Sequence, residues 1–260
     1  MRTEPVTSSG ALLFARYAHP PNLLGYCGPT DHLSFFEQAT EGVVDRGLGE
    51  LTQAFDGAWP YLELIASANG IRDPLDRAVV HAYWIGNPLL ERVDMSALGD
   101  SIEERFRRRV GRGWDHLSTT ILAGAVPHHT FHVLLVSPWT GLMRAGHPDH
   151  PLHVMDRCRI RWGRVIEVVG DAASVAVSTL RWDGRELGID STGTELATVK
   201  TDGRGFLPDL HPGDHVSLHW NWVCDRLSPR DVRSLDRYTT RHLSLGNQGN
   251  RRSSDAADLW

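Results

Sequence analysis

Two stretches of the sequence decide the fold. The first is Cys158-Arg-Ile-Arg-Trp-Gly163-Arg164-Val165-Ile166-Glu167-Val168, followed by Gly170-Asp171 and Ala173; the second is Gly213-Asp214-His215-Val216-Ser217-Leu218-His219-Trp220-Asn221-Trp222-Val223. Alternating and β-branched residues over 161–169 and 174–180 are typical of strands, and Asp183-Gly184 is a strong hairpin signal. Residues 215–222 are predicted to continue the strand pattern. Short strands at this spacing predict a small β-barrel.

The part of the chain before these stretches has a helical period. Asp31 is a candidate N-cap, and Leu33, Phe36 and Ala39 follow at spacings of three to four residues. A further helix is expected to open at Trp59-Pro60 and to close at Asn69-Gly70. Because residues 14–31 are rich in proline and glycine, we expect a shaped loop there. Residues 228–245 return to a helical pattern.

These patterns predict an α+β protein in three parts. Residues 1–150 would form a mainly helical domain, residues 151–245 a β-barrel with a C-terminal helix, and residues 246–260 a flexible polar tail. The boundary would fall in the stretch 141–153, which is rich in glycine, proline and histidine.

Composition excludes several classes of protein. The chain has 260 residues, 41% of them hydrophobic, which is typical of a globular protein. A formal net charge of −5 disfavours nucleic-acid binding through a positive field. No apolar run is long enough to span a membrane, and no signal peptide opens the sequence, so a cytoplasmic protein is expected. Three cysteines in a reducing compartment would be thiols.

The two barrel stretches resemble the HypC/HupF family of [NiFe]-hydrogenase maturation chaperones. The shared features are a cysteine followed after four residues by Gly163-Arg164-Val165, and Gly213-Asp214-x-Val216-x-x-His219 before a strand containing aromatic residues. The family's small OB-like barrel opens at that cysteine and finishes in a helix, and the resemblance covers about residues 156–245. This sequence departs from the family in having an internal Cys158 and Trp162 where a proline is usual. The N-terminal half resembles uncharacterised actinobacterial proteins found near hydrogenase genes.

The resemblance implies that Cys158 and His219 bind iron carrying cyanide and carbon monoxide ligands. A thiolate and an imidazole suit low-spin iron. Arg157, Arg159 and Arg161 would surround the thiol with positive charge, lower its pKa and pair with the cyanide nitrogens.

Two further candidate sites lie in the helical half. Cys27 stands in the proline- and glycine-rich loop, shortly before a predicted helix N-terminus that would favour its thiolate. His128 and His132 share one face on either a helix or a strand, so both could reach one metal ion. The glutamate of a zinc-protease HExxH motif is missing.

The sequence therefore predicts an accessory protein for [NiFe]-hydrogenase assembly, which would pass an iron fragment to the hydrogenase large subunit or to another maturation factor. On this interpretation it is not a turnover enzyme. A mononuclear metal-dependent enzyme that uses the histidine-rich segment is the first alternative, and a protein-binding module without metal is the second. Fold alone does not separate them.

Overall fold

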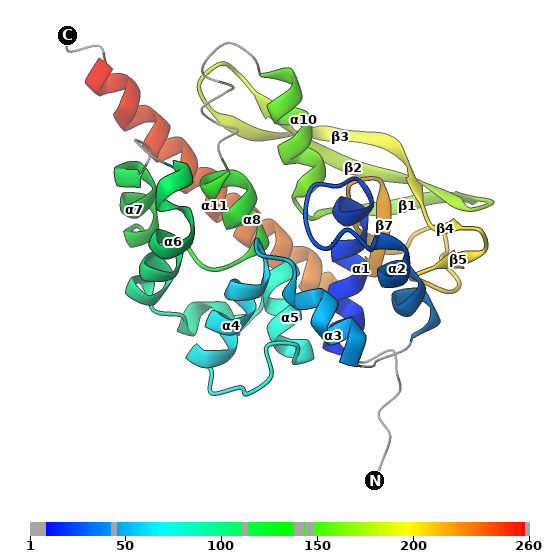
Figure 1. The fold of residues 1–260 in the computed structure, drawn as a ribbon. Coiled ribbons are helices and arrows are strands. Elements are labelled where there is room, and N and C mark those ends of the chain that lie inside the picture. Colours follow the sequence, from blue (N-terminus) through cyan, green and yellow to red (C-terminus); the bar gives the residue numbers. More distant parts are fainter. Residues whose placement is uncertain (1–8, 43–45, 111–113, 138–142, 144–147, 258–260) are drawn as a thin grey trace.

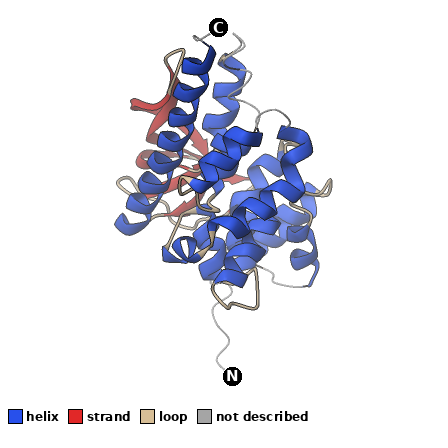
Figure 2. Ribbon diagram, turned by 90° about the vertical axis from the view of Figure 1, so that its left-hand side faces the viewer, coloured by secondary structure: helices blue, strands red, loops and turns tan. Residues whose placement is uncertain are grey.

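The computed structural model describes residues 9–42, 46–110, 114–137, 143 and 148–257. Helices and strands both contribute to the fold, which is therefore α+β, as the sequence predicts (Figure 1). Figure 2 shows the strands lying among helices rather than apart from them. Among the described residues, no helix has both the length and the apolar character needed to cross a bilayer.

The helical part of the chain precedes the sheet. Its elements are α1 (Gly10–Leu23), α2 (His32–Glu41), α3 (Arg46–Gln53), α4 (Trp59–Ala68), α5 (Arg77–Trp84), η2 (Pro88–Arg92), α6 (Met95–Val110), α7 (Trp114–Leu122), α8 (His129–Phe131), η4 (His132–Val136) and α10 (Asp149–Cys158). The predicted N-cap is confirmed, because the Asp31 side chain accepts a hydrogen bond from the Ser34 backbone N–H. The predicted ends of α4 at Trp59 and Asn69 are confirmed as well.

The strands pair in the closed order β1-β2-β3-β7-β6. Their bounds are β1 (Arg161–Val169), β2 (Ala172–Trp182), β3 (Leu187–Thr198), β6 (His215–His219) and β7 (Trp222–Arg226), with β4 (Lys200–Thr201) and β5 (Arg204–Gly205) as a separate small ribbon. All pairings in the ring are antiparallel except β3 with β7. The interior is filled by small and branched side chains such as Val165, Val175 and Val216.

One hydrophobic cluster joins the helical half to the sheet. It contains Phe14 and Trp84 from the helices, Trp222 and Cys224 from β7, and Tyr238 from the last helix, α11 (Pro229–Ala257). Helix α11 contacts α7, α8 and η4 as well as β1 and β3, and Figure 1 shows it running along both parts. The two predicted domains are thus packed through a common core. Most of the predicted boundary stretch lies outside the described residues.

Three sequence predictions about elements are wrong. Residues 14–23 of the predicted loop 14–31 belong instead to helix α1, with Pro20 and Pro21 in its last turn, because the burial of its apolar residues outweighs the lost N–H donors; residues 24–31 lie between α1 and α2, outside both helices. Helix α11 continues past Leu245 to Ala257, so most of the stretch predicted as a flexible tail is helical. Residues 215–222 are not one strand, because β6 ends at His219 and β7 begins at Trp222.

Candidate metal centre

Three side chains from distant parts of the chain converge inside the molecule. His129, Cys158 and His219 each offer one ligand atom, and these atoms all lie within 4.8 Å of one another. His129 begins α8, Cys158 ends α10, and His219 ends β6. The resemblance named Cys158 and His219 as a pair, and the fold brings them together. His129 comes from the helical half, so the cluster is built by both halves of the chain.

His219 has one nitrogen free for a ligand. Its Nδ1–H donates to the Tyr17 carbonyl oxygen at 2.5 Å, while its Nε2 has no hydrogen-bond partner among the described residues. The residue is only 1% exposed, and burial holds the pKa of its imidazole well below the usual range. The ring is therefore neutral, with the lone pair of Nε2 buried and unsatisfied. A backbone carbonyl that fixes the tautomer in this way is typical of metal-binding histidines.

His129 is held at both nitrogens. Its Nε2 lies 2.8 Å from the Cys158 carbonyl oxygen, and its Nδ1 lies 3.1 Å from the Tyr83 hydroxyl, which also reaches the Gly57 carbonyl at 3.4 Å. Burial lowers the pKa of His129 to about 4, so this imidazole is neutral too. Moving its proton to Nδ1 lets the ring donate to the Tyr83 oxygen while that hydroxyl donates to Gly57. Nε2 then carries a lone pair instead of a proton, with no change in charge, and its contact with the Cys158 carbonyl oxygen must open before a metal ion binds there.

The thiol of Cys158 is protonated without a metal. Burial raises its pKa, and the charge of Cys27 contributes in the same direction. The prediction that three arginines would lower this pKa is wrong, because their guanidinium groups form ion pairs with carboxylates. Loss of water around the sulfur therefore decides its ionisation.

The three arginines are committed to carboxylates. Arg159, which is 1% exposed, donates to Asp156 at 3.0 Å and to the Ser178 carbonyl at 2.7 Å. Arg157 and Arg161 pair with Glu195 at 2.8 and 2.7 Å. Arg161 also donates to the Trp220 carbonyl. These contacts hold in place the segments that carry Cys158 and His219. Pairing of the arginines with cyanide nitrogens stays a prediction.

The predicted histidine pair His128 and His132 does not converge on the cluster. The Nδ1 of His128 accepts from the Thr130 backbone N–H as the N-cap of α8. The Nδ1 of His132 contacts the Tyr61 hydroxyl at 3.2 Å. Spacing of i and i+4 places residues on one helix face only inside a regular helix, but here a cap and a π-helical turn occupy these positions. His129 is not among the ligands predicted from sequence, and no spacing rule selects it over its neighbours.

The predicted ligand Cys27 also lies outside the cluster. It stands between α1 and α2, and its sulfur does not belong to the group of three ligand atoms within 4.8 Å. The residue as a whole is exposed, yet burial of the sulfur raises its pKa to about 12, so the prediction that a helix N-terminus would favour its thiolate is wrong.

Next to His219, the backbone adopts a rare conformation. Trp220 and Asn221 form the two-residue loop between β6 and β7, and Trp220 has a φ of 54°. Hairpin loops of this length favour glycine, asparagine or aspartate at positive φ. Trp220 is held there because its N–H donates to the Arg157 carbonyl at 2.8 Å and its ring stacks on Tyr26 at 4.4 Å. Strain of this kind is concentrated at functional sites.

The donor set is one sulfur and two nitrogens. Thiolate and imidazole together suit iron, zinc and copper rather than magnesium or calcium. Three protein ligands leave one position open for a further ligand. Tyr17, Tyr83 and Trp84 surround the imidazoles: Trp84 lies 4.6 Å from the ring of His129 and 5.7 Å from that of His219. Aromatic side chains therefore pack against both imidazoles, while Cys158 keeps an intermediate exposure.

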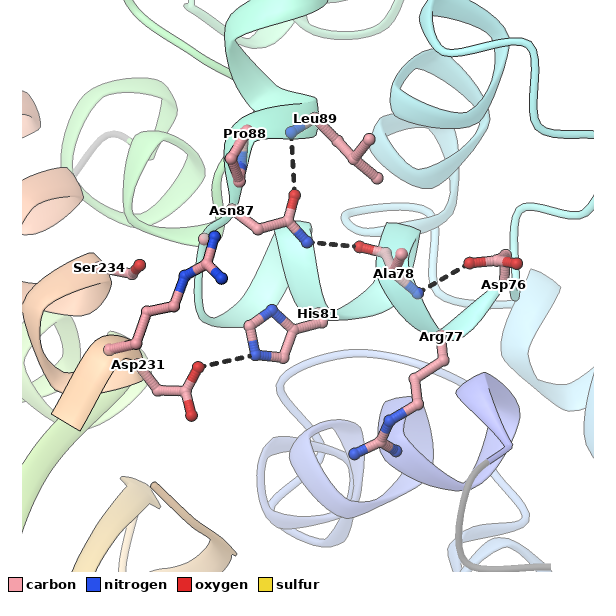
Figure 3. Close-up of a pocket in the computed structure, with 11 residues that line it drawn as sticks. Asp76, Arg77, Ala78, His81, Asn87, Pro88, Leu89, Asp231 and Ser234 are labelled. Atoms are coloured by element: carbon pink, nitrogen blue, oxygen red, sulfur yellow. Dashed lines mark hydrogen bonds and ion pairs between the residues drawn. The ribbon is translucent and has the colours of Figure 1, made fainter. Parts of the chain in front are cut away.

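A separate cleft of about 890 Å³ lies between α5 and the start of α11. Figure 3 shows His81 pointing toward Asp231, with its Nε2 3.1 Å from the carboxylate, while Asn87 bridges Ala78 and Leu89. None of the three cluster residues lines this cleft. Its carboxylates are already bonded within the protein, since Asp76 and Asp231 accept from backbone N–H groups at the starts of α5 and α11.

Fold and site together define an α+β protein with a His-Cys-His cluster that could hold a metal ion. The chain belongs to the family of unknown function DUF6390, whose family profile matches residues 6–253. No curated protein and no solved structure matches it.

Proposed function

We propose that this protein binds one iron centre through His129, Cys158 and His219 and acts as an accessory protein in [NiFe]-hydrogenase assembly. The observation that carries this proposal is the convergence of Cys158 with His219 inside one cluster. These are the two residues that the HypC/HupF resemblance selects, and they are 61 positions apart in sequence. A buried, unpartnered Nε2 on His219 adds support, because such an atom is costly unless it meets a ligand.

The rest of the proposal follows from the same resemblance. The closed strand order is compatible with an OB-like barrel, followed by helix α11 in the place of the family's terminal helix. The cargo would be iron with cyanide and carbon monoxide ligands, and the recipient would be the hydrogenase large subunit or another maturation factor in the cytoplasm. Aromatic walls suit such a fragment, because cyanide and carbon monoxide bound to iron need protection from solvent and oxidants.

Infrared spectroscopy tests the cargo directly. The full chain is co-produced with the hydrogenase maturation proteins, purified without oxygen, and examined for iron content and for cyanide and carbonyl stretching bands. We expect about one iron per chain with both types of band, and loss of both in Cys158→Ser and His219→Gln. Cys224→Ser is the matched control, because its buried sulfur is not among the three ligand atoms of the cluster. A wild-type protein with no bands would refute the hydrogenase role.

A mononuclear metal-dependent enzyme remains the second candidate. It is favoured by the open coordination position and by His129, which lies outside the barrel that resembles the chaperones. This alternative predicts stoichiometric iron without cyanide or carbonyl bands, and metal loss in His129→Gln. Iron that carries both types of band, with iron and bands lost together in His129→Gln, would instead support the hydrogenase role.

A further inference from the structure

The cleft between α5 and the start of α11 has walls that the fold holds in place. Gly86 has a φ of 99°, and a Cβ at this position would lie 2.2 Å from the ring of Tyr238, so the turn after α5 packs directly on α11. The Tyr238 hydroxyl donates to the Asn87 carbonyl at 3.2 Å, and the Asn87 amide donates to the Ala78 carbonyl at 2.8 Å. The walls of the cleft are therefore preformed, as is usual for small-molecule sites.

Both carboxylates of the cleft already have partners within the protein. Asp76 accepts from the Ala78 N–H at 2.8 Å. Asp231 accepts from His81 at 3.1 Å through one oxygen, and from the N–H and the hydroxyl of Ser228 at 2.9 and 2.6 Å through the other. Burial lowers the pKa of His81 despite this partner, so near pH 7 the ring is neutral and its Nε2–H donates to Asp231. A cationic ligand would have to compete with these bonds.

Two arginines line the same cleft without such partners. Arg77 begins α5 and Arg230 lies in the first turn of α11, so each helix supplies one guanidinium group. Within the part of the chain that the structure describes, neither guanidinium group forms an ion pair or a hydrogen bond. The neighbouring Arg237 differs, because it pairs with Glu91 at 3.0 Å. The positive charges of Arg77 and Arg230 are thus available to a ligand.

The groups that keep hydrogen-bonding capacity define the chemistry of the ligand. A guanidinium group only donates, and its planar fork matches the oxygens of carboxylate and phosphate groups. In Figure 3 the His81 ring lies between Arg77 and Ser234, and its Nδ1 bonds none of the other lining residues. Because His81 is neutral, Nδ1 accepts a hydrogen bond and suits a hydroxyl group of the ligand. The volume of about 890 Å³ is within the range of small-molecule sites, about 300–1,000 Å³.

We infer that the cleft between α5 and α11 binds a small organic anion, whose carboxylate or phosphate groups are held by Arg77 and Arg230. Hydroxy acids and sugar phosphates have this chemistry, because they combine several anionic oxygens with hydroxyl groups. The site is separate from the candidate metal centre, since none of the three cluster residues lines the cleft. The inference therefore adds a second ligand and does not depend on the proposed iron.

Isothermal titration of the metal-free full chain with pyrophosphate, and separately with citrate, tests this inference. Ionic strength is held constant, because added salt screens general charge attraction. We expect one saturable site per chain for at least one probe; binding of pyrophosphate alone indicates a phosphate ligand, and binding of citrate alone a carboxylate ligand. Arg77→Ala and Arg230→Ala should each weaken binding at least about tenfold, since a hydrogen bond to a charged group contributes a factor of about 10–100 in affinity.

Arg233→Ala is the matched control, because it removes an exposed arginine of α11 that does not line the cleft. This variant and Cys158→Ser should bind the probe with wild-type affinity. Ala78→Phe narrows the cleft without changing its charge and should weaken binding, and circular dichroism checks that each variant is folded. Saturable binding of neither probe would overturn the inference. Wild-type affinity in both Arg77→Ala and Arg230→Ala, or an equal loss in Arg233→Ala, would overturn it as well.

Discussion

The buried ion pair of Asp156 and Arg159 should govern both stability and the position of Cys158. Both residues are almost fully buried, at 6% and 1% exposed. One oxygen of Asp156 accepts from two Arg159 nitrogens, at 3.2 and 3.0 Å, and from the Leu180 backbone N–H at 2.7 Å. The pair thereby connects the end of α10 to β2, and Arg159 directly follows Cys158 in the chain.

Replacing Asp156 by alanine leaves a guanidinium buried without its countercharge. Burial already lowers the pKa of Arg159 to about 10 in the presence of its partner. Removing one member of a buried pair typically costs about 3–5 kcal/mol. Because Arg159 keeps its bond to the Ser178 carbonyl, we expect the lower end, about 3 kcal/mol. For a chain of this size that corresponds to a fall in Tm of about 6–12 °C.

Urea and thermal unfolding measure this loss. Asp156→Asn should lose less than Asp156→Ala, because the amide oxygen still accepts from Leu180. The control Glu103→Ala removes an exposed partner of Arg107 on α6 and should cost less than about 0.5 kcal/mol. Metal affinity should fall in Asp156→Ala and not in Glu103→Ala. A loss below about 1 kcal/mol in Asp156→Ala, similar to the control, would refute the reasoning.

Three further predictions concern packing and pH. Gly163→Ala places a Cβ 2.5 Å from the Ala176 carbonyl oxygen, so the urea midpoint should drop by the equivalent of about 1–3 kcal/mol. The control is Gly193→Ala, whose Cβ meets open space and should not lower the midpoint similarly. Burial lowers the pKa of His242 to about 3, so as the pH falls the unfolded chain takes up a proton at this histidine before the folded chain does. The contribution of neutral His242 to the free energy of unfolding is therefore intact above about pH 6.5 and is lost as the pH falls toward 3. The loss is at most about 1.4 kcal/mol per pH unit. Urea unfolding at pH 7, 5 and 4 should show this slope, reduced in His242→Gln. Because the pKa of Cys158 is raised, zinc affinity measured by competition should increase at least about tenfold per unit between pH 6.5 and 8, and a flat profile would contradict proton displacement.

The sequence predicted elements best where local signals act alone. The alternation over 161–169 predicts β1 with its observed bounds, and the side chain of Asp31 marks the start of α2. It failed where long-range packing overrides local preference: residues 10–23 form a helix despite two prolines, because their apolar side chains are buried in the common core.

The candidate site was predicted in part. The motif pair selected Cys158 and His219, and the structure confirms that they lie together. Periodicity selected His128 and His132, but the local backbone is a cap followed by a π-helical turn, and His129, one of the three residues between them, belongs to the cluster. The arginines around Cys158 were visible in sequence, but their pairing with Asp156 and Glu195 was not.

By itself, the sequence determined the α+β class and the period of several strands and helices, and it selected Cys158 and His219 as candidate ligands. Only the tertiary structure decided that His129 completes the cluster and that burial, rather than nearby positive charge, controls the Cys158 thiol. The physical reason is that metal coordination and desolvation depend on distances between side chains far apart in the chain, which local sequence patterns do not encode.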